Sequence, residues 1–449
     1  IYDRNNRIVA ENVPGYTVKL LATNADSLEA VLRRLATIVP LEEESIRDVV
    51  RRYQQARYQP AQVMGDAPLE VVARLEEHRI LLPGLVIQAE PKRYYPAANA
   101  VAHVAGYVSE VSQADLEKER YPGAEPGTQV GKYGLELQYD SILRGTRGIR
   151  YVEVDARGRM VREEGATPPL PPVAGEPIHT TLDLGLQVFV DSIWPEGVRG
   201  AMVAMTPTGE ILSLYSAPSF NPNDFIGGIS SRKYRELVTD SARPLLNRAI
   251  QARYPPASPF KLAVAIMGLK RGAININSRM DIPCRGGMQM GNRYFRCWKK
   301  EGHGSLDLTG AIAQSCDVYF YQLGARLGLD AILEEGAELG FRDYTGIDLA
   351  NEISPIYPAG REYFDEAYGP RGWTAQSTAL NFSIGQGENT QTLIGMTRFY
   401  QGLANGGTET VPFLVEPTSD EVRDLGITPL QAEQLRNALM MVVEQGTAA

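Results

Sequence analysis

This chain is poor in cysteine, histidine and long apolar runs, and each shortage excludes a class of protein. Its 449 residues include only three cysteines and four histidines. No apolar stretch approaches the ~18 residues that span a bilayer, so no membrane helix is predicted. Positive charge is also in deficit, and the net charge of -9 argues against a nucleic-acid partner. Gly-x-Ser-x-Gly and His-Glu-x-x-His motifs are absent, which disfavours a serine hydrolase with a histidine base.

Length predicts two domains, because 449 residues exceed the usual size of one core. We expect a mixed α+β domain over residues 1–162, with amphipathic helices at 27–38 and 41–53. Five prolines fall within 163–177, a composition that favours an extended linker. A second domain is expected over 178–449.

The second domain begins with a hairpin signal and continues with helical patterns. Two β-rich runs, 202–205 and 211–214, flank a Pro-Thr-Gly turn. Apolar periodicity then predicts helices over 262–270, 309–327 and 393–404.

Ser258 and Lys261 form the strongest chemical signal in the chain. They stand three residues apart, with Pro259 between them, at the start of an apolar helical run. Residues three apart share one helix face, so the lysine can lie against the serine hydroxyl and act as its base. A second Ser-x-x-Lys, Ser230 to Lys233, lies among charged residues without an apolar helix behind it. That copy is interpreted as a solvated surface segment.

Ser315 and Asp317 offer a second hydroxyl and a carboxylate in apolar surroundings. A serine that is hydrogen-bonded to the lysine could relay a proton to a departing amine. Two alternatives remain open: Ser315 could be a purely structural helix serine, and Ser305 with Asp307 matches the same Ser-x-Asp pattern.

All three cysteines lie within 33 residues, together with one histidine, in the order Cys284, Cys297, His303, Cys316. Three thiolates and an imidazole form a soft ligand set that suits tetrahedral structural zinc. The spacing is longer than in zinc-finger knuckles. The alternative is a disulfide between Cys284 and Cys297, with Cys316 as a buried free thiol.

Several separated segments together resemble the class B penicillin-binding proteins, which are monofunctional D,D-transpeptidases. The resemblance spans nearly the whole chain and is greatest to the elongation-specific penicillin-binding protein 2 subgroup. The segments that carry it are Ile1 to Asn5, Gly134-Leu135-Glu136, Leu143-Arg144-Gly145, Val154 to Arg159, Thr180 to Asp183 and Ser383-Ile384-Gly385-Gln386-Gly387. The implied fold is a non-catalytic pedestal followed by a penicillin-binding, β-lactamase-like domain, in which helices sandwich an antiparallel sheet.

The resemblance assigns roles to the candidate site residues. Ser258 corresponds to the acylated serine and Lys261 to its base, although Pro259 and Ala257 replace the threonine and glycine that are common there. Ser315 corresponds to the serine of the second motif, and Asp317 replaces the usual asparagine, as it does in the elongation-specific subgroup.

Two further features of the subgroup bear on this chain. Cys284, Cys297, His303 and Cys316 occupy positions like those of a zinc site in that subgroup. The third family motif, Lys-Thr-Gly or Lys-Ser-Gly, is absent from the 449 residues. We therefore expect its strand to follow Ala449 in the natural protein, because without it the site would lack a wall and an oxyanion-hole amide.

The resemblance implies cross-linking of peptidoglycan stem peptides through an acyl-serine during cell elongation, with covalent binding of β-lactams and no cofactor for the chemistry. The alternatives are a serine β-lactamase or D,D-carboxypeptidase, and a non-catalytic β-lactam-binding receptor. Implied partners are stem peptides on lipid-linked precursor strands, a SEDS-family glycosyltransferase and a scaffold protein of the elongation complex. The chain begins at Ile1 without a methionine, which indicates that something upstream was removed, such as a secretion signal or a membrane anchor. The resemblance implies a single N-terminal membrane anchor and a location on the outer face of the cytoplasmic membrane.

Overall fold

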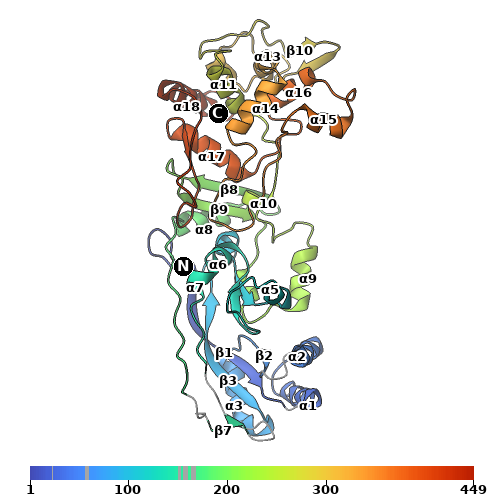
Figure 1. Cartoon of the computed structure of the whole chain (residues 1–449), viewed down its shortest axis with the longest axis vertical. Coiled ribbons are helices and arrows are strands. Elements are labelled where there is room, and N and C mark those ends of the chain that lie inside the picture. Colours follow the sequence, from blue (N-terminus) through green and yellow to red (C-terminus); the bar gives the residue numbers. More distant parts are fainter. Residues whose placement is uncertain (23, 56–59, 150–152, 155–159, 163–167) are drawn as a thin grey trace. The chain divides into compact units, whose positions relative to one another are not determined.

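The computed structural model describes the whole chain except residues 23, 56–59, 150–152, 155–159 and 163–167 (Figure 1). It divides into two compact units, one made of Ile1–Arg199 with Ala217–Leu245, the other of Gly200–Ser216 with Leu246–Ala449. Helices and antiparallel strand pairs occur in both, which confirms the α+β class. Across the described residues, no helix combines the length and the apolar character that crossing a membrane requires.

The first unit is built on a three-stranded antiparallel sheet of order β2-β1-β3. Its strands are β1 (Glu11–Leu20), β2 (Ala61–Met64) and β3 (Leu85–Tyr94). Helices α1 (Ala25–Leu35) and α2 (Glu43–Gln55) lie together beside β2 (Figure 1). Leu28, Leu32 and Leu35 are fully buried in the core that these elements share.

Both predicted helices of this unit are confirmed, with shifted ends. α1 begins earlier than the apolar pattern indicated because Asn24 caps it: the Asn24 side chain accepts a hydrogen bond from the Ser27 backbone amide at 2.8 Å. A capping side chain satisfies a free amide of the first turn, so helix growth can begin before the first apolar residue.

The remaining elements of the first unit are mostly short. They are α3 (Leu69–Glu77), η1 (Arg79–Leu81), η2 (Ala98–Val101), α4 (Ala102–Ala105), β4 (Val108–Glu110), α5 (Gln113–Glu117), β5 (Gln129–Gly131), α6 (Gly134–Gln138), α7 (Asp140–Leu143), β6 (Glu153–Val154), β7 (Met160–Arg162), α8 (Leu184–Ile193), η3 (Pro222–Phe225) and α9 (Ser231–Thr239). On α6, Glu136 is buried and binds Arg93 at 2.6 Å, so the charge of the Gly-Leu-Glu segment is neutralised inside the unit.

The expected linker, 163–177, lies partly outside the described residues. Its described part is largely exposed and forms isolated bridges, Leu170 with Ile149 and Val173 with Thr146.

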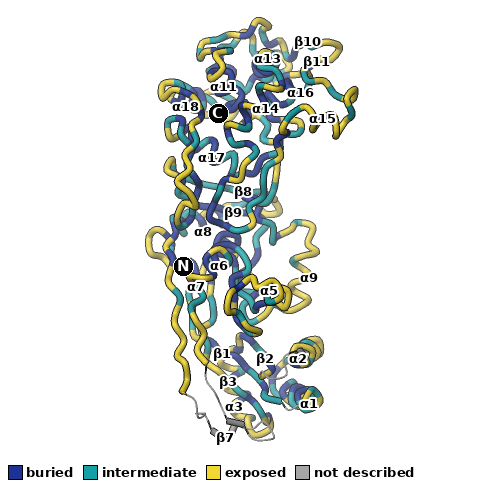
Figure 2. Tube along the Cα trace, in the orientation of Figure 1, coloured by how far each residue is buried: buried dark blue, intermediate teal, exposed yellow. Residues whose placement is uncertain are grey.

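In the second unit, helix α11 (Phe260–Lys270) lies at the centre of the core. Every residue from Phe260 to Leu269 is buried (Figure 2). A helix that is apolar on all sides must be surrounded by other elements, and α13 and α14 pack against it. The start of α11, where the Ser-x-x-Lys pattern falls, is therefore held by the best-packed part of the unit.

Around α11 the unit contains three pairs of strands and a set of helices. These are β8 (Gly200–Met205), β9 (Ile211–Ala217), α10 (Arg248–Gln251), β10 (Gly287–Met290), β11 (Arg293–Arg296), α12 (Leu308–Ala313), α13 (Asp317–Leu327), α14 (Leu329–Glu338), α15 (Arg361–Tyr368), α16 (Ala375–Phe382), α17 (Leu393–Ala404), β12 (Thr408–Thr410), β13 (Val422–Asp424) and α18 (Pro429–Glu444). The hairpin predicted around the Pro-Thr-Gly turn is confirmed as β8 paired with β9.

The continuous helix predicted over 309–327 is wrong. The structure has two helices there, α12 and α13, with Ser315 between them at a φ of 49°. A positive φ is incompatible with a right-handed helix, so the helix must break at Ser315. The apolar pattern continues through this position and therefore does not reveal the break.

Helix α18 offers a test of the packing in the second unit. Leu435 is fully buried against the core, whereas Leu430 on the same helix is 62% exposed. Leu435→Ala should lower the free energy of unfolding by about 3 kcal/mol, because it leaves a cavity. Leu430→Ala, the matched control, should change it by less than about 0.5 kcal/mol. Urea denaturation followed by circular dichroism measures both, and equal effects would contradict this packing.

Candidate active site and the neighbouring cysteine cluster

Ser258 lies on the surface immediately before α11, and Lys261 lies in the first turn of that helix. Ser258 is exposed, whereas Lys261 is only 3% exposed. The Lys261 backbone amide donates to the Ser258 carbonyl at 3.0 Å, which places both residues in one tight turn. Ala257 has a φ of 52°, an uncommon value for a residue with a side chain. The strained backbone at Ala257 thus holds the exposed Ser258 hydroxyl close to the buried Lys261 amine.

The Lys261 ammonium is surrounded by acceptors from the break between α12 and α13. Its Nζ donates to the Ser315 carbonyl at 2.9 Å, to the Ser315 Oγ at 3.0 Å and to the Asp317 Oδ1 at 2.6 Å. The Ser315 hydroxyl donates in turn to the Ser258 Oγ at 3.0 Å. A continuous chain of hydrogen bonds therefore runs from the buried amine through Ser315 to the exposed serine.

The sequence predicts the Ser315 hydroxyl on the lysine, and the structure puts it in contact with Ser258 as well. The pattern suggested that Lys261 lies directly against Ser258, but the Ser315 hydroxyl is the group bonded to Ser258. An ammonium has three N–H donors, and Ser315 and Asp317 accept the three hydrogen bonds described. Ser315 is therefore no ordinary helix serine, because its positive φ and both of its oxygens serve this arrangement.

The glycine-rich loop after α16 supports the backbone before Ser258. The Ala257 amide donates to the Gly385 carbonyl at 2.9 Å. Gly385 has a φ of 69°, and a Cβ there would lie 2.2 Å from the Ala257 carbonyl oxygen. Only glycine allows the two backbones to approach this closely. The Ser-Ile-Gly-Gln-Gly segment thus acts on the site through its backbone.

Trp298 is a site residue that sequence reasoning missed. Its backbone amide donates to the Asp317 Oδ2 at 3.0 Å, and its indole Nε1 donates to the carbonyls of Gln314 and Ser315, both at 3.1 Å. Both carboxylate oxygens of Asp317 are therefore occupied, one by Lys261 and one by Trp298. The sequence signal that could have identified Trp298 is its position directly after Cys297, one of the four candidate metal ligands.

The two decoy patterns have structural roles. Ser230 caps α9 by accepting a hydrogen bond from the Lys233 amide at 3.3 Å, and α9 has no buried residue. Asp307 caps α12 by accepting one from the Gly310 amide at 2.9 Å. Capping explains a serine or an aspartate before a helix without any chemistry.

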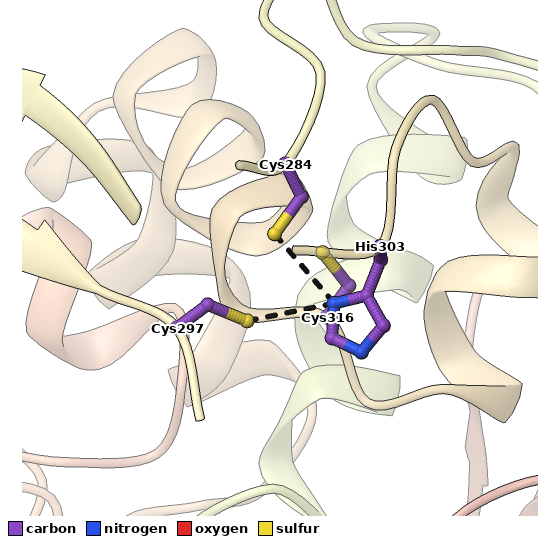
Figure 3. A group of neighbouring side chains, drawn as sticks. All are labelled: Cys284, Cys297, His303 and Cys316. Carbon is purple, nitrogen blue, oxygen red and sulfur yellow. Dashed lines mark hydrogen bonds between the residues drawn. The ribbon is translucent and has the colours of Figure 1, made fainter. Parts of the chain in front are cut away.

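The three cysteines and His303 converge on one point (Figure 3). Their ligand atoms lie within 4.8 Å of one another, and both Cys284 Sγ and Cys297 Sγ are 3.6 Å from the His303 Nδ1. Ligand bonds of zinc at ordinary lengths place sulfur and nitrogen about 3.6 Å apart in a tetrahedron. All three cysteines are free thiols. The residues present therefore fit a tetrahedral metal ion.

The thiols of this cluster influence one another. The hydrogen bond between Cys316 and Cys297 lowers the pKa of Cys297 to about 5 and raises that of Cys316. A thiol that loses its proton readily is a better metal ligand, because the thiolate is the binding form.

The cluster and the hydrogen-bonded chain share two short stretches of backbone. Cys316 lies between Ser315 and Asp317, and Cys297 directly precedes Trp298. Whatever orders the cluster therefore also positions the groups around Lys261. An activated hydroxyl, a buried amine and a relay hydroxyl in line are suited to covalent acyl transfer, which defines the class of site.

Comparisons with known proteins show the family. Residues 1–180 match the family described as Penicillin-binding Protein dimerisation domain, and residues 200–449 match Penicillin binding protein transpeptidase domain. The chain belongs to the penicillin-binding protein transpeptidase family. The two-domain fold expected from the resemblance is confirmed.

Individual relatives agree with this placement. The chain is 35% identical to Peptidoglycan D,D-transpeptidase MrdA of Escherichia coli (strain K12), over 94% of this chain and 66% of that protein, just under two thirds of its length. The solved complex between Penicillin-Binding Protein (PBP2) and MreC from Helicobacter pylori gives a TM-score of 0.81 at 29% identity, covering 98% of this chain and 82% of that one. A structure titled as a peptidoglycan synthase complex that coordinates polymerization and crosslinking gives 0.73 at 28% identity, covering 100% and 76%.

The contact between Gly385 and Ala257 predicts a specific loss of stability. Gly385→Ala should lower the free energy of unfolding by about 3 kcal/mol, because a positive φ and a backbone clash act together. Gly369 has a φ of 74°, and a Cβ added there would meet open space. Gly369→Ala should therefore lower the free energy of unfolding by only about 1 kcal/mol, the cost of the positive φ alone. Equal losses in chemical denaturation would show that the Ala257 contact is unimportant.

Proposed function

We propose that this protein is a serine-type peptidoglycan D,D-transpeptidase that cross-links stem peptides through an acyl-serine during cell-wall elongation. The observation that carries the proposal is the hydrogen-bonded chain from Lys261 through Ser315 to Ser258. It lies in a domain whose family is named for transpeptidation. The relative in Escherichia coli is named for the same activity.

The geometry suggests how the acyl-enzyme forms. The Ser258 Oγ attacks the carbonyl of the D-Ala-D-Ala peptide bond and passes its proton to the Ser315 Oγ. Once the Lys261 ammonium has released one proton to solvent, its neutral Nζ acts as the base and accepts the proton of Ser315. Collapse of the tetrahedral adduct breaks the peptide bond, and the proton returns through Ser315 to the departing nitrogen, so that free D-alanine leaves.

Resolution of the acyl-serine reverses the same proton path. An amine on a neighbouring stem peptide attacks the ester carbonyl and passes its proton through Ser315 to the Lys261 Nζ. The bond between the acyl carbon and the Ser258 Oγ then breaks, and the proton returns through Ser315 to the freed Ser258 hydroxyl as the cross-link forms. Asp317 holds the Lys261 amine throughout, because its other oxygen is fixed by the Trp298 backbone. A β-lactam would acylate Ser258 by the same route, since its amide imitates the end of the substrate.

For the cysteine cluster we propose a structural zinc ion held by Cys284, Cys297, His303 and Cys316. When bound, zinc would supply rigidity rather than reactivity, because four protein ligands leave no open position. By ordering Cys297 and Cys316 it would fix the neighbouring residues that contact Lys261. No cofactor is needed for the acyl transfer itself.

Two structural neighbours support the partners that we propose, and the resemblance of the sequence supports the location. One structural neighbour was solved with MreC and another within a peptidoglycan synthase complex. We propose that this chain likewise works at the outer face of the cytoplasmic membrane. There it would act on lipid-linked precursor strands, beside a SEDS-family glycosyltransferase and a scaffold protein of the elongation complex.

Covalent labelling tests the catalytic assignment. In the natural full-length protein, benzylpenicillin should add one acyl group to Ser258, detected by intact-mass spectrometry and peptide mapping. Ser258→Ala should carry no adduct. Ser230→Ala is the matched control, since it removes the serine of the second Ser-x-x-Lys, and it should be labelled like the unaltered protein.

Two results would overturn the assignment: labelling at another residue, or labelling that survives in Ser258→Ala. Rapid hydrolysis of the adduct would instead favour a β-lactamase or carboxypeptidase. Stable labelling without cross-linking of paired stem peptides would favour a β-lactam-binding receptor.

Metal analysis tests the cysteine cluster. The purified protein should contain one zinc ion per chain by inductively coupled plasma mass spectrometry, and a chelator should lower its melting temperature by several degrees. His303→Asn should lose most of the zinc, whereas His78→Asn, a histidine in the other unit, should keep it. An intact mass two hydrogens lighter without zinc would show a disulfide instead.

A further inference from the structure

The β10–β11 hairpin concentrates positive charge on a chain that is otherwise acidic. Residues 282–306 contain five basic side chains and a single acidic one, Glu301, whereas the whole chain carries a net charge of -9. The basic residues are Arg285, Arg293, Arg296, Lys299 and Lys300. Strand β10 lies at the periphery of the second unit (Figure 1). Such a local reversal of charge is typical of a surface that receives an anion.

The alternation along β11 directs its side chains to two faces. Phe295 and Cys297 are buried, whereas Tyr294, Arg296 and Trp298 are exposed. Successive side chains of an extended strand point to opposite sides, so Tyr294 and Arg296 share the outer face of β11. Trp298, two residues beyond the end of the strand, is exposed as well. Tyr294 and Trp298 keep about half of their surface exposed, at 52% and 55%. Two exposed aromatic rings therefore flank an arginine.

The cations on and beside this face are not neutralised within the described part of the protein. No ion pair there involves Arg285, Arg296, Lys299 or Lys300, although many other arginines and lysines of the chain form one. The segment that contains Arg285 and the segment that contains Lys299 and Lys300 lie side by side. Their backbones approach so closely that a Cβ on Gly286 would lie 2.0 Å from the Lys300 carbonyl oxygen. We call Arg285, Tyr294, Arg296, Trp298, Lys299 and Lys300 the basic hairpin face.

The basic hairpin face is attached directly to the candidate active site. Trp298 bonds Asp317 through its backbone and the Ser315 carbonyl through its indole. Those two residues hold Lys261. Lys299 and Lys300 follow within two residues of Trp298. The cationic residues are therefore next in sequence to a residue that contacts the hydrogen-bonded chain.

We propose that the basic hairpin face is a subsite that binds the free side-chain carboxylate of a stem peptide while the peptide reacts at Ser258. The inference rests on the proposed function. A peptide carboxylate suits Arg296 because a guanidinium can bind both oxygens at once. The exposed rings of Tyr294 and Trp298 supply apolar surface for the peptide between its charges. A subsite connected to the nucleophile through Trp298 and Ser315 would orient the peptide without taking part in the chemistry, which makes Arg296 a positioning residue.

A binding experiment with two synthetic peptides tests this subsite. The probes are a stem pentapeptide ending in D-Ala-D-Ala with a free side-chain carboxylate, and the same peptide with that carboxylate amidated. Isothermal titration should show tighter binding of the free acid to the unaltered full-length protein. Arg296→Glu should weaken that binding roughly ten-fold and remove the preference over the amide, because attraction becomes repulsion.

Three comparisons make the test specific. Arg296→Lys should restore most of the affinity, since it keeps the charge. Arg52→Glu, an exposed arginine of α2 in the other unit, makes the same change of net charge and should leave the affinity within two-fold. Raising the salt concentration should weaken binding of the free acid more than binding of the amide. Melting temperatures establish that each variant is folded.

The outcomes separate this inference from the proposed function. Equal affinity for acid and amide, or an Arg296→Glu variant that binds like the unaltered protein, would overturn the subsite. So would a variant that loses affinity only for vesicles of anionic phospholipid, which would make the face a membrane contact. Failure of the proposed function would appear instead as absent penicillin labelling of Ser258 in the unaltered protein, a separate measurement.

Discussion

The structure of the candidate site depends on one buried positive charge, the Lys261 ammonium. Its side chain is 4% exposed and the Asp317 carboxylate, 2.6 Å away, is 14% exposed. Removing one partner of such a pair typically costs about 3–5 kcal/mol, because the other charge is left buried without compensation. The pair thus forces the break between α12 and α13 to face the start of α11. In doing so it places the Ser315 hydroxyl between the amine and Ser258.

Two further supports hold that arrangement from opposite sides. The glycine loop after α16 fixes the backbone before Ser258, through a contact that excludes any side chain at Gly385. Trp298 and the cysteine cluster fix the other side, because they share residues 297–298 and 315–317 with the hydrogen-bonded chain. A metal ion in that cluster would fix Cys297 and Cys316, which are adjacent in sequence to Trp298, Ser315 and Asp317. Structural and chemical roles are thus interleaved along the same few residues.

The fold was predictable where one short segment carries enough information. The hairpin at the Pro-Thr-Gly turn and the two N-terminal helices followed from local patterns, and the earlier start of α1 is explained by the Asn24 cap. The prediction of one helix over 309–327 failed because apolar periodicity continues through Ser315. The break there is imposed by hydrogen bonds to Lys261, which is 54 residues away in sequence. A local pattern holds no trace of such a distant partner.

The residue types at the candidate site could be identified from the sequence. The Ser-x-x-Lys and Ser-x-Asp patterns and the set of three cysteines with one histidine each indicate only a few kinds of chemistry. Folding separates the copies of each pattern: Ser230 and Asp307 cap helices, while Ser258 and Ser315 are in contact although 57 positions apart. Trp298 and the basic hairpin face emerged only in three dimensions. Proximity between distant segments is created by packing and by the pairing of buried charges, and neither is encoded in the spacing of neighbouring residues.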